Sequence, residues 1–243
     1  MVTKNQIKRI KSLHQKKYRK EYQLFIAEGA KVVQELLNSN FVLEHIYVTE
    51  EMSFDVRKDL ISLVSESDLK KMSALSTANN CLAVFHMPIE KSVDFTDWVV
   101  ALDDVRDPGN LGTIIRLCDW FGIGHLICSS QTVDVFNPKV VQATMGSLSR
   151  VNVVYGDLVR LIQDSQVKYV YGTFMDGDNI YQAGLQQHQG IVVMGNEANG
   201  ISKEIEQLVT QRISIPRFGS LQQTESLNVA MATSIIISEL KRS

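Results

Sequence analysis

Short runs of aliphatic and β-branched residues alternate with helical segments through most of the chain, and this alternation constrains the fold more than any other feature. In the C-terminal part the runs are bounded by Gly and Pro, which is typical of strands joined by short loops. We expect strands at 98–103, 125–129, 151–155, 169–174, 191–195 and 212–215, with helices near 111–120 and 138–146. This order predicts an α/β fold in which a largely parallel sheet is covered on both faces.

A second, smaller alternation of the same kind precedes it, between residues 23 and 88. Its β-rich runs are 24–27, 41–48, 60–64 and 81–87, and a helix is expected at 29–38. Residues 87–97 contain a proline and a mixture of charged and small polar residues, which interrupts the pattern. We therefore expect two domains, residues 1–92 and 93–243.

Positive charge is concentrated at the N-terminus. The chain has 25 Lys and Arg against 27 Asp and Glu, yet its first twenty residues carry eight of the basic residues and no acid. With Tyr18 and Tyr22 beside it, such a block can neutralise the phosphates of a nucleic acid. A solvated helical arm that only keeps the protein soluble explains the charge equally well, so charge alone does not decide between them.

Several classes of protein are disfavoured by composition. The longest apolar stretches, 190–195 and 230–237, are well below the roughly 18 residues of a membrane span. No apolar segment follows the basic N-terminus as in a secretory signal, so we expect a cytosolic protein that does not act in a membrane. The three cysteines and five histidines lack the spacing of disulfides or metal ligands, so we predict buried thiols and no metal.

Three loops that follow predicted strands carry unusual residues, and parallel sheets bind ligands beyond the carboxyl ends of their strands. In the first loop a Pro-Gly turn precedes Asn110, which we expect to cap the next helix, and Arg116 follows six residues later. In the second, Glu197 lies between two glycines, and Ser202 is the expected cap of the helix after it. Each loop alone also fits an ordinary capped helix.

The third loop leads from the strand at 212–215 into the last helix. Thr224 or Ser226 is its expected cap, and Asn228 offers a further hydrogen-bonding group beside the free amides of the helix start. None of the three loops has the pattern of a P-loop, a dinucleotide fingerprint or a nucleophile elbow.

Taken together, in order and spacing across residues 97–243, the three loops resemble the SpoU/TrmH family of S-adenosylmethionine-dependent RNA 2′-O-methyltransferases, of the SPOUT superfamily. The matching positions are Asn110, Gly112 and Arg116, then Gly195, Glu197 and Gly200, then Ile215, Pro216 and 226–229. Residues 1–90 resemble the substrate-binding extension of the family, notably at 12–19 and 25–29. The chain departs from the family at Arg217, where Met is common, and in a longer loop at 220–225.

The resemblance implies a fold, a cofactor and partners. The fold is a small L30e-like α/β domain that binds RNA, followed by a parallel-sheet domain with a deep trefoil knot, and the assembly is a homodimer. The cofactor is S-adenosylmethionine, with a pocket lined by Thr173, Met194, Gly195, Ile215 and Leu227. The partner is RNA, and the added N-terminal domain favours ribosomal RNA over transfer RNA.

The resemblance also implies the catalytic residues Asn110, Arg116, Glu197, Ser226 and Asn228. Because arginine stays protonated, we expect Arg116 to clamp an RNA phosphate and to stabilise the developing alkoxide rather than to act as a base. The asparagines and Ser226 would orient the ribose and Arg116, while Glu197 would orient Arg116 or Asn110, or accept the proton. The alternatives are a catalytically inactive RNA-binding assembly factor, a tRNA ribose methyltransferase and an unrelated α/β enzyme.

Overall fold

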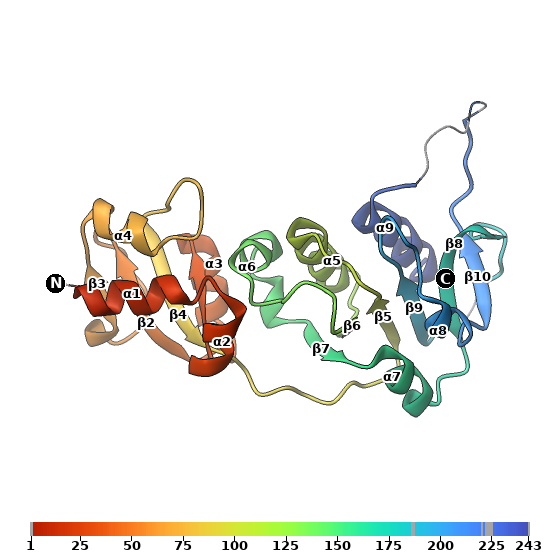
Figure 1. Cartoon of the computed structure of the whole chain (residues 1–243), viewed down its shortest axis with the longest axis horizontal. Helices are drawn as coiled ribbons and strands as arrows, with labels where there is room; N and C mark the ends of the chain where they lie inside the picture. The colour runs from red at the N-terminus through yellow and green to blue at the C-terminus, as the bar shows by residue number, and fades with distance from the viewer. Residues whose placement is uncertain (1, 186–187, 220, 222–225, 243) are drawn as a thin grey trace. The chain divides into compact units, whose positions relative to one another are not determined.

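The computed structural model describes residues 2–185, 188–219, 221 and 226–242, and the chain divides into two compact units (Figure 1). The smaller unit combines residues 1–89 with 134–149, and the larger combines 90–133 with 150–243. The chain therefore passes from one unit to the other three times, because a segment from the C-terminal part of the sequence packs with the N-terminal part.

The smaller unit is built on a four-stranded mixed sheet in the order β1-β4-β2-β3. Strand β4 pairs antiparallel with β1 and β2, and β2 pairs parallel with β3. Ile10, Leu69 and Met72 of the helices α1 and α4 pack in one hydrophobic cluster with the sheet. In chain order, the elements from the N-terminal part are α1 (Lys4–Ser12), α2 (Lys16–Tyr22), β1 (Leu24–Glu28), α3 (Ala30–Leu37), β2 (Leu43–Val48), η1 (Lys58–Leu60), β3 (Ile61–Leu63), α4 (Glu66–Met72) and β4 (Cys81–His86).

The segment 134–149, with α6 (Pro138–Thr144) and η2 (Ser147–Ser149), completes this unit. Arg19 is only 2% exposed and donates from Nε and Nη2 to Oδ2 of Asp134, at 3.1 and 2.5 Å. Its Nη1 donates to the carbonyl oxygens of Leu13 and His14. The rings of Phe25 and Phe136 also meet, with centroids 4.8 Å apart. The segment is thus held by a buried ion pair as well as by apolar packing.

The larger unit contains a six-stranded sheet in the order β10-β8-β9-β5-β6-β7, in which every neighbouring pair is parallel. The chain moves from β5 through β6 to β7 at one edge, and then continues with β8 on the other side of β9. The strand order therefore reverses between β5 and β9, where parallel sheets bind ligands. Its elements are β5 (Trp98–Leu102), α5 (Pro108–Trp120), β6 (His125–Ser129), β7 (Asn152–Gly156), α7 (Leu158–Ser165), β8 (Val170–Asn179), β9 (Gly190–Met194), α8 (Lys203–Glu206), β10 (Gln211–Ser214) and α9 (Val229–Leu240).

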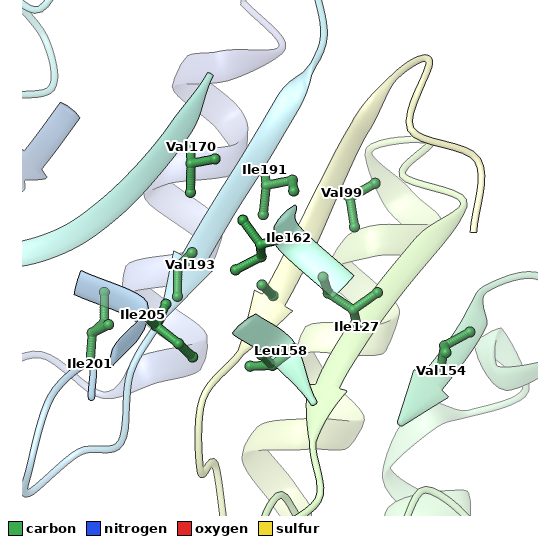
Figure 2. Packing of buried hydrophobic residues seen from close by; sticks show 11 residues of the cluster. Val99, Ile127, Val154, Leu158, Ile162, Val170, Ile191, Val193, Ile201 and Ile205 are labelled. Carbon is green, nitrogen blue, oxygen red and sulfur yellow. The ribbon is translucent and has the colours of Figure 1, made fainter. Parts of the chain in front are cut away.

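The central strands β5 and β9 are buried at every residue, which explains their continuous apolar sequence. Figure 2 shows one face of the sheet, where Val99, Ile127 and Ile191 pack in a cluster with Leu158 and Ile162 of α7. The rigid core thus fixes the carboxyl ends of the strands from which the candidate loops leave.

The predicted parallel α/β architecture is confirmed. The predicted strands of the larger unit coincide with observed ones to within one residue, except that β8 continues past Phe174 to Asn179. Helix α7 was not predicted; Asp157 caps it by accepting from the amides of Val159 and Arg160. Within the described residues, no helix combines the length and the apolar character that crossing a membrane requires.

Candidate active site

In the first loop, the residue that caps α5 is not the one predicted from the sequence. Helix α5 begins at Pro108, and Asp107 caps it by accepting from the amide of Asn110 at 2.8 Å. The expected capping role of Asn110 is therefore wrong. Because Asp107 satisfies the helix start, the side-chain amide of Asn110 is left to reach other loops.

A chain of side-chain hydrogen bonds joins the three loops. Asn110 donates from Nδ2 to Oε1 of Glu197 at 2.6 Å, and its Oδ1 accepts from Nδ2 of Asn228 at 2.9 Å. These residues are 87 and 118 positions from Asn110 in sequence. The structure thus brings together three of the five predicted catalytic residues, each from a different loop.

The loop that carries Glu197 is shaped by Asn196. Its Oδ1 accepts from the amides of Ala198 and Asn199, its backbone forms a bridge with Gly200, and its Nδ2 donates to the carbonyl oxygen of Asp104 at 2.8 Å. Asn196 is not among the site residues predicted from the sequence. Its position between Gly195 and Glu197 was the available signal.

Asp103 also holds the loop of Glu197 and was likewise not predicted as a site residue. The side chain is buried, and its Oδ2 accepts from the amide of Ser202 at 2.7 Å. Ser202 stands at the predicted cap position of α8, but its side chain makes no capping hydrogen bond. This hydrogen bond connects the first loop to the end of the second. The available signal in the sequence was an acidic residue directly after a buried strand.

The third loop ends at Asn228, which caps α9 by accepting from the amides of Ala230 and Met231 at 3.0 and 3.2 Å. The predicted caps were Thr224 and Ser226. Thr224 lies outside the described residues, and the cap belongs to Asn228 rather than to Ser226. One side chain therefore both starts the helix, through Oδ1, and holds Asn110, through Nδ2.

A cavity of about 1150 Å³ opens beside this network. All five residues predicted to hold a cofactor line it, together with two of the predicted catalytic residues: Thr173, Met194, Gly195, Ile215 and Leu227, then Glu197 and Ser226. A Cβ at Gly195 would lie 2.3 Å from the carbonyl carbon of Gly200, so only glycine fits that part of the wall.

Phe174 forms another part of the cavity wall, and its ring contacts an arginine that belongs to an ion-pair network. Cζ of Arg212 lies 3.5 Å from the centroid of its ring. Arg212 in turn pairs with Asp176 at 2.6 Å and with Glu206. The hydrogen bond from Arg212 lowers the pKa of Asp176, which keeps that carboxylate charged.

Arg116 stands apart from this arrangement. It is exposed on α5 and does not line the cavity, and its side chain makes no hydrogen bond or ion pair with another described residue. Glu197, which was expected to orient Arg116 or Asn110, contacts Asn110. Ser226 is exposed at the cavity and likewise has no hydrogen-bond partner in the described part of the chain.

The three cysteines have no reactive thiolate to contribute to the site. Cys81, Cys118 and Cys128 are all buried and unpaired, as predicted. Burial raises the pKa of Cys81 and Cys118 to about 12 and also raises that of Cys128, which suppresses the nucleophilic thiolate. Among the described residues, no group of three or more side chains is arranged to hold a metal ion.

Comparison with known proteins assigns the chain to a family. The model of the SpoU rRNA Methylase family matches residues 97–238, and a model described as the MRM3-like substrate binding domain matches residues 4–83. The chain therefore belongs to the SpoU rRNA methylase family. The predicted class, an S-adenosylmethionine-dependent RNA 2′-O-methyltransferase, is confirmed.

Individual relatives match over nearly the whole length. The 23S rRNA (guanosine(2553)-2′-O)-methyltransferase RlmP of Bacillus subtilis is 32% identical over 246 residues, which cover 98% of this chain and 97% of that protein. A solved structure from Porphyromonas gingivalis, described as belonging to the TrmH family, is 39% identical with a TM-score of 0.89, covering 100% and 99% of the two chains. The AdoMet-bound rRNA methyltransferase from Sinorhizobium meliloti is 29% identical with a TM-score of 0.84, covering 100% and 96%.

Proposed function

We propose that this protein transfers a methyl group from S-adenosylmethionine to a ribose 2′-hydroxyl of ribosomal RNA. The observation that carries the proposal is the hydrogen-bonded chain of Glu197, Asn110 and Asn228 beside a cavity of about 1150 Å³. The carboxylate of Glu197 lines a cavity large enough for a nucleoside cofactor, and the amides of Asn110 and Asn228 continue the hydrogen-bonded chain from it. Its relative RlmP, matched over nearly its full length, is named for this reaction on 23S rRNA.

The cavity fits the cofactor chemically. Met194, Ile215 and Leu227 supply apolar surface for an adenine ring, and Gly195 lets the backbone approach closely. Thr173 donates its hydroxyl to the carbonyl oxygen of Val193 at 3.0 Å, which leaves the oxygen lone pairs to accept a hydrogen bond. When bound, S-adenosylmethionine supplies a methyl group already activated by its sulfonium.

The residues of the chain then have two tasks, which are to orient the ribose and to remove its proton. Asn110 holds Glu197 and is itself held by Asn228, and we infer that these amides help to orient the ribose. The second carboxylate oxygen of Glu197 makes no hydrogen bond within the described residues, so it is placed to accept the hydroxyl proton. Arg116 binds an RNA phosphate and stabilises the developing alkoxide, and Ser226 hydrogen-bonds the ribose.

We also propose that the enzyme works as a homodimer. Arg116 has no partner among the described residues, and two large apolar side chains on α5 and α9, Trp120 and Met231, are 84% and 64% exposed. Exposed apolar surface beside an unsatisfied catalytic cation is consistent with a second copy of the chain covering these helices.

The finer features of the fold are proposed on the same basis. We propose that the larger domain contains the deep trefoil knot and that α9 takes part in it. The supporting observation is the hydrogen bond from Asn228, at the start of α9, to Asn110 in the first turn of α5. Residues 1–92, whose sheet carries the basic arm, are proposed to be an L30e-like domain that binds RNA; the match to a substrate-binding domain model supports this role.

The reaction is tested by incubating the protein with tritiated S-adenosylmethionine and RNA from a strain that lacks the gene. We expect label in ribosomal RNA, in dinucleotides that resist alkaline hydrolysis because the 2′-hydroxyl is blocked. Glu197→Gln serves as the matched inactive control. Label confined to transfer RNA would replace the proposed substrate, and the absence of label from all RNA would indicate a binding protein without catalysis.

A further inference from the structure

Two tyrosines of α2 form a cluster with cations of the N-terminal arm. The rings of Tyr18 and Tyr22 lie 6.1 Å apart between centroids and are inclined by 20°. Cζ of Arg9 lies 5.6 Å from the centroid of Tyr22, and Nζ of Lys17 lies 5.6 Å from that of Tyr18. Tyr22 is 37% exposed. We call Arg9, Lys17, Tyr18 and Tyr22 the aromatic-basic cluster.

The cluster is held in place by the buried side of α2. Arg19 points into the unit, where it bonds Asp134 and two carbonyl oxygens, and this fixes the rotation of the helix. At 100° per residue, Tyr18 and Tyr22 both lie to one side of Arg19, while Lys16 and Lys20 lie to the other. The rings are therefore presented in a set position, which lowers the entropic cost of binding.

The electrostatic surroundings of the cluster favour an anion. The exposed cations of the two helices are Lys4, Lys8, Arg9, Lys11, Lys16, Lys17 and Lys20. The acids nearby are Glu21 on α2 and Glu44, which pairs with Arg9 at 3.7 Å and with His86 at 3.0 Å. Because both Arg9 and Glu44 are more than a third exposed, this ion pair is weak and does not prevent Arg9 from binding phosphate.

We propose that the aromatic-basic cluster binds an unpaired nucleotide of the RNA substrate, whose base stacks on Tyr22 while the neighbouring cations bind the flanking phosphates. Aromatic rings interleaved with cations are the recurring design for single-stranded nucleic acid, whereas duplex RNA is bound through its shape and backbone. The inference rests on the proposed function, because it takes RNA as the ligand, and it goes further by requiring a single-stranded element.

The test measures binding of the full-length protein to a 12-mer oligoadenylate in which one base is 2-aminopurine, and to a 12-base-pair RNA duplex. Stacking on an aromatic ring quenches the fluorescence of 2-aminopurine. A tyrosine that only supports the fold would leave this fluorescence unchanged. We expect Tyr22→Leu to weaken binding of the single strand about tenfold and to reduce the quenching, because it removes the π-face. Tyr22→Phe retains both. The duplex affinity changes little, and Tyr181→Leu, at another exposed tyrosine, is the matched control.

Salt dependence separates the two kinds of contact. Arg9→Gln and Lys17→Gln should reduce the slope of log affinity against log salt, because these two cations lie at the rings, whereas Tyr22→Leu should leave the slope unchanged. Equal affinity and quenching for Tyr22→Leu and wild type would overturn the stacking proposal, as would failure of the wild type to bind the single strand. Methylation of ribosomal RNA by an unimpaired Tyr22→Leu variant would leave the proposed enzymatic function intact while rejecting the stacking site. Loss of methyl transfer by the wild type would reject the enzymatic function itself.

Discussion

Replacing Asp134 with Asn tests how strongly the segment 134–149 is held in the smaller unit. The change keeps the side-chain volume but leaves the guanidinium of Arg19, 2% exposed, without its anion. Removing one partner of a buried ion pair costs about 3–5 kcal/mol. The lower end applies here, because Asp134 is 15% exposed and two carbonyl oxygens still accept from Arg19. We therefore expect the smaller unit to lose about 3 kcal/mol of stability.

The loss is measured by urea titration combined with amide hydrogen exchange, read on peptides from β1 and β4, so that unfolding of the smaller unit is followed separately. Asp59→Asn is the matched control, since it removes an ion pair with Arg57 whose side chains are 75% and 67% exposed. That pair should contribute less than about 1 kcal/mol. If Asp134→Asn costs no more than Asp59→Asn, the segment is not anchored by this ion pair and the reasoning fails.

Four further changes examine the candidate active site. Arg116→Lys should lower turnover at least about tenfold through loss of bidentate geometry while calorimetry shows unchanged binding of S-adenosylmethionine; normal turnover contradicts the assignment. If Arg116 acts across a dimer, mixing the inactive variants Arg116→Ala and Glu197→Gln should restore about a quarter of wild-type methyl transfer, and no activity should return if both residues serve the site of their own chain. Arg212→Ala should raise the Kd for S-adenosylmethionine several-fold and change kcat less, because Phe174 of the cavity wall loses the guanidinium that lies 3.5 Å from the centroid of its ring. An unaltered Kd would show that Phe174 keeps its position without Arg212. Gly195→Ala should abolish cofactor binding in the same titration, since its Cβ would lie 2.3 Å from Gly200; retained affinity would mean that the loop can shift.

The sequence pattern predicted the larger sheet well because a strand buried on both faces leaves a local signature. β5 and β9 read as short apolar runs bounded by polar residues, and both lie where that signature placed them. The same pattern contains no information on which strands are neighbours. That β5 adjoins β9, and that Asn110 therefore meets Glu197, is determined by the packing of the whole sheet.

Helix starts were less predictable because several capping residues compete within one loop. Asp107 and Asn110 both have the chemistry of a cap, and the choice falls on Asp107 because Pro108 fits the first turn. At the last helix, Asn228 takes the place expected of Ser226 or Thr224. Local chemistry lists the candidates, whereas the path of the chain into the helix selects among them.

The placement of α6 could not be predicted for a different reason. A helix was correctly predicted there, yet nothing in the local sequence indicates that it packs with residues of the N-terminal part. The direction comes from Phe136 packing on Phe25 and from Asp134 meeting the buried charge of Arg19. Such long-range pairs become visible only when both partners are folded.

The position of Arg116 relative to Asn110 limits how the two can act on one ribose. Six residues along a helix correspond to a rise of about 9 Å and a turn of about 240°. Asn110 contacts Glu197 and Asn228, so by this rotation Arg116 leaves α5 on a different side from Asn110, and it is not among the residues that line the cavity. A guanidinium that stabilises an alkoxide must reach hydrogen-bonding distance of it. In the proposed homodimer, the carboxylate of one chain and the arginine of a second copy would meet that requirement together. The mixing experiment tests this arrangement, because activity from two inactive variants requires a site shared between chains.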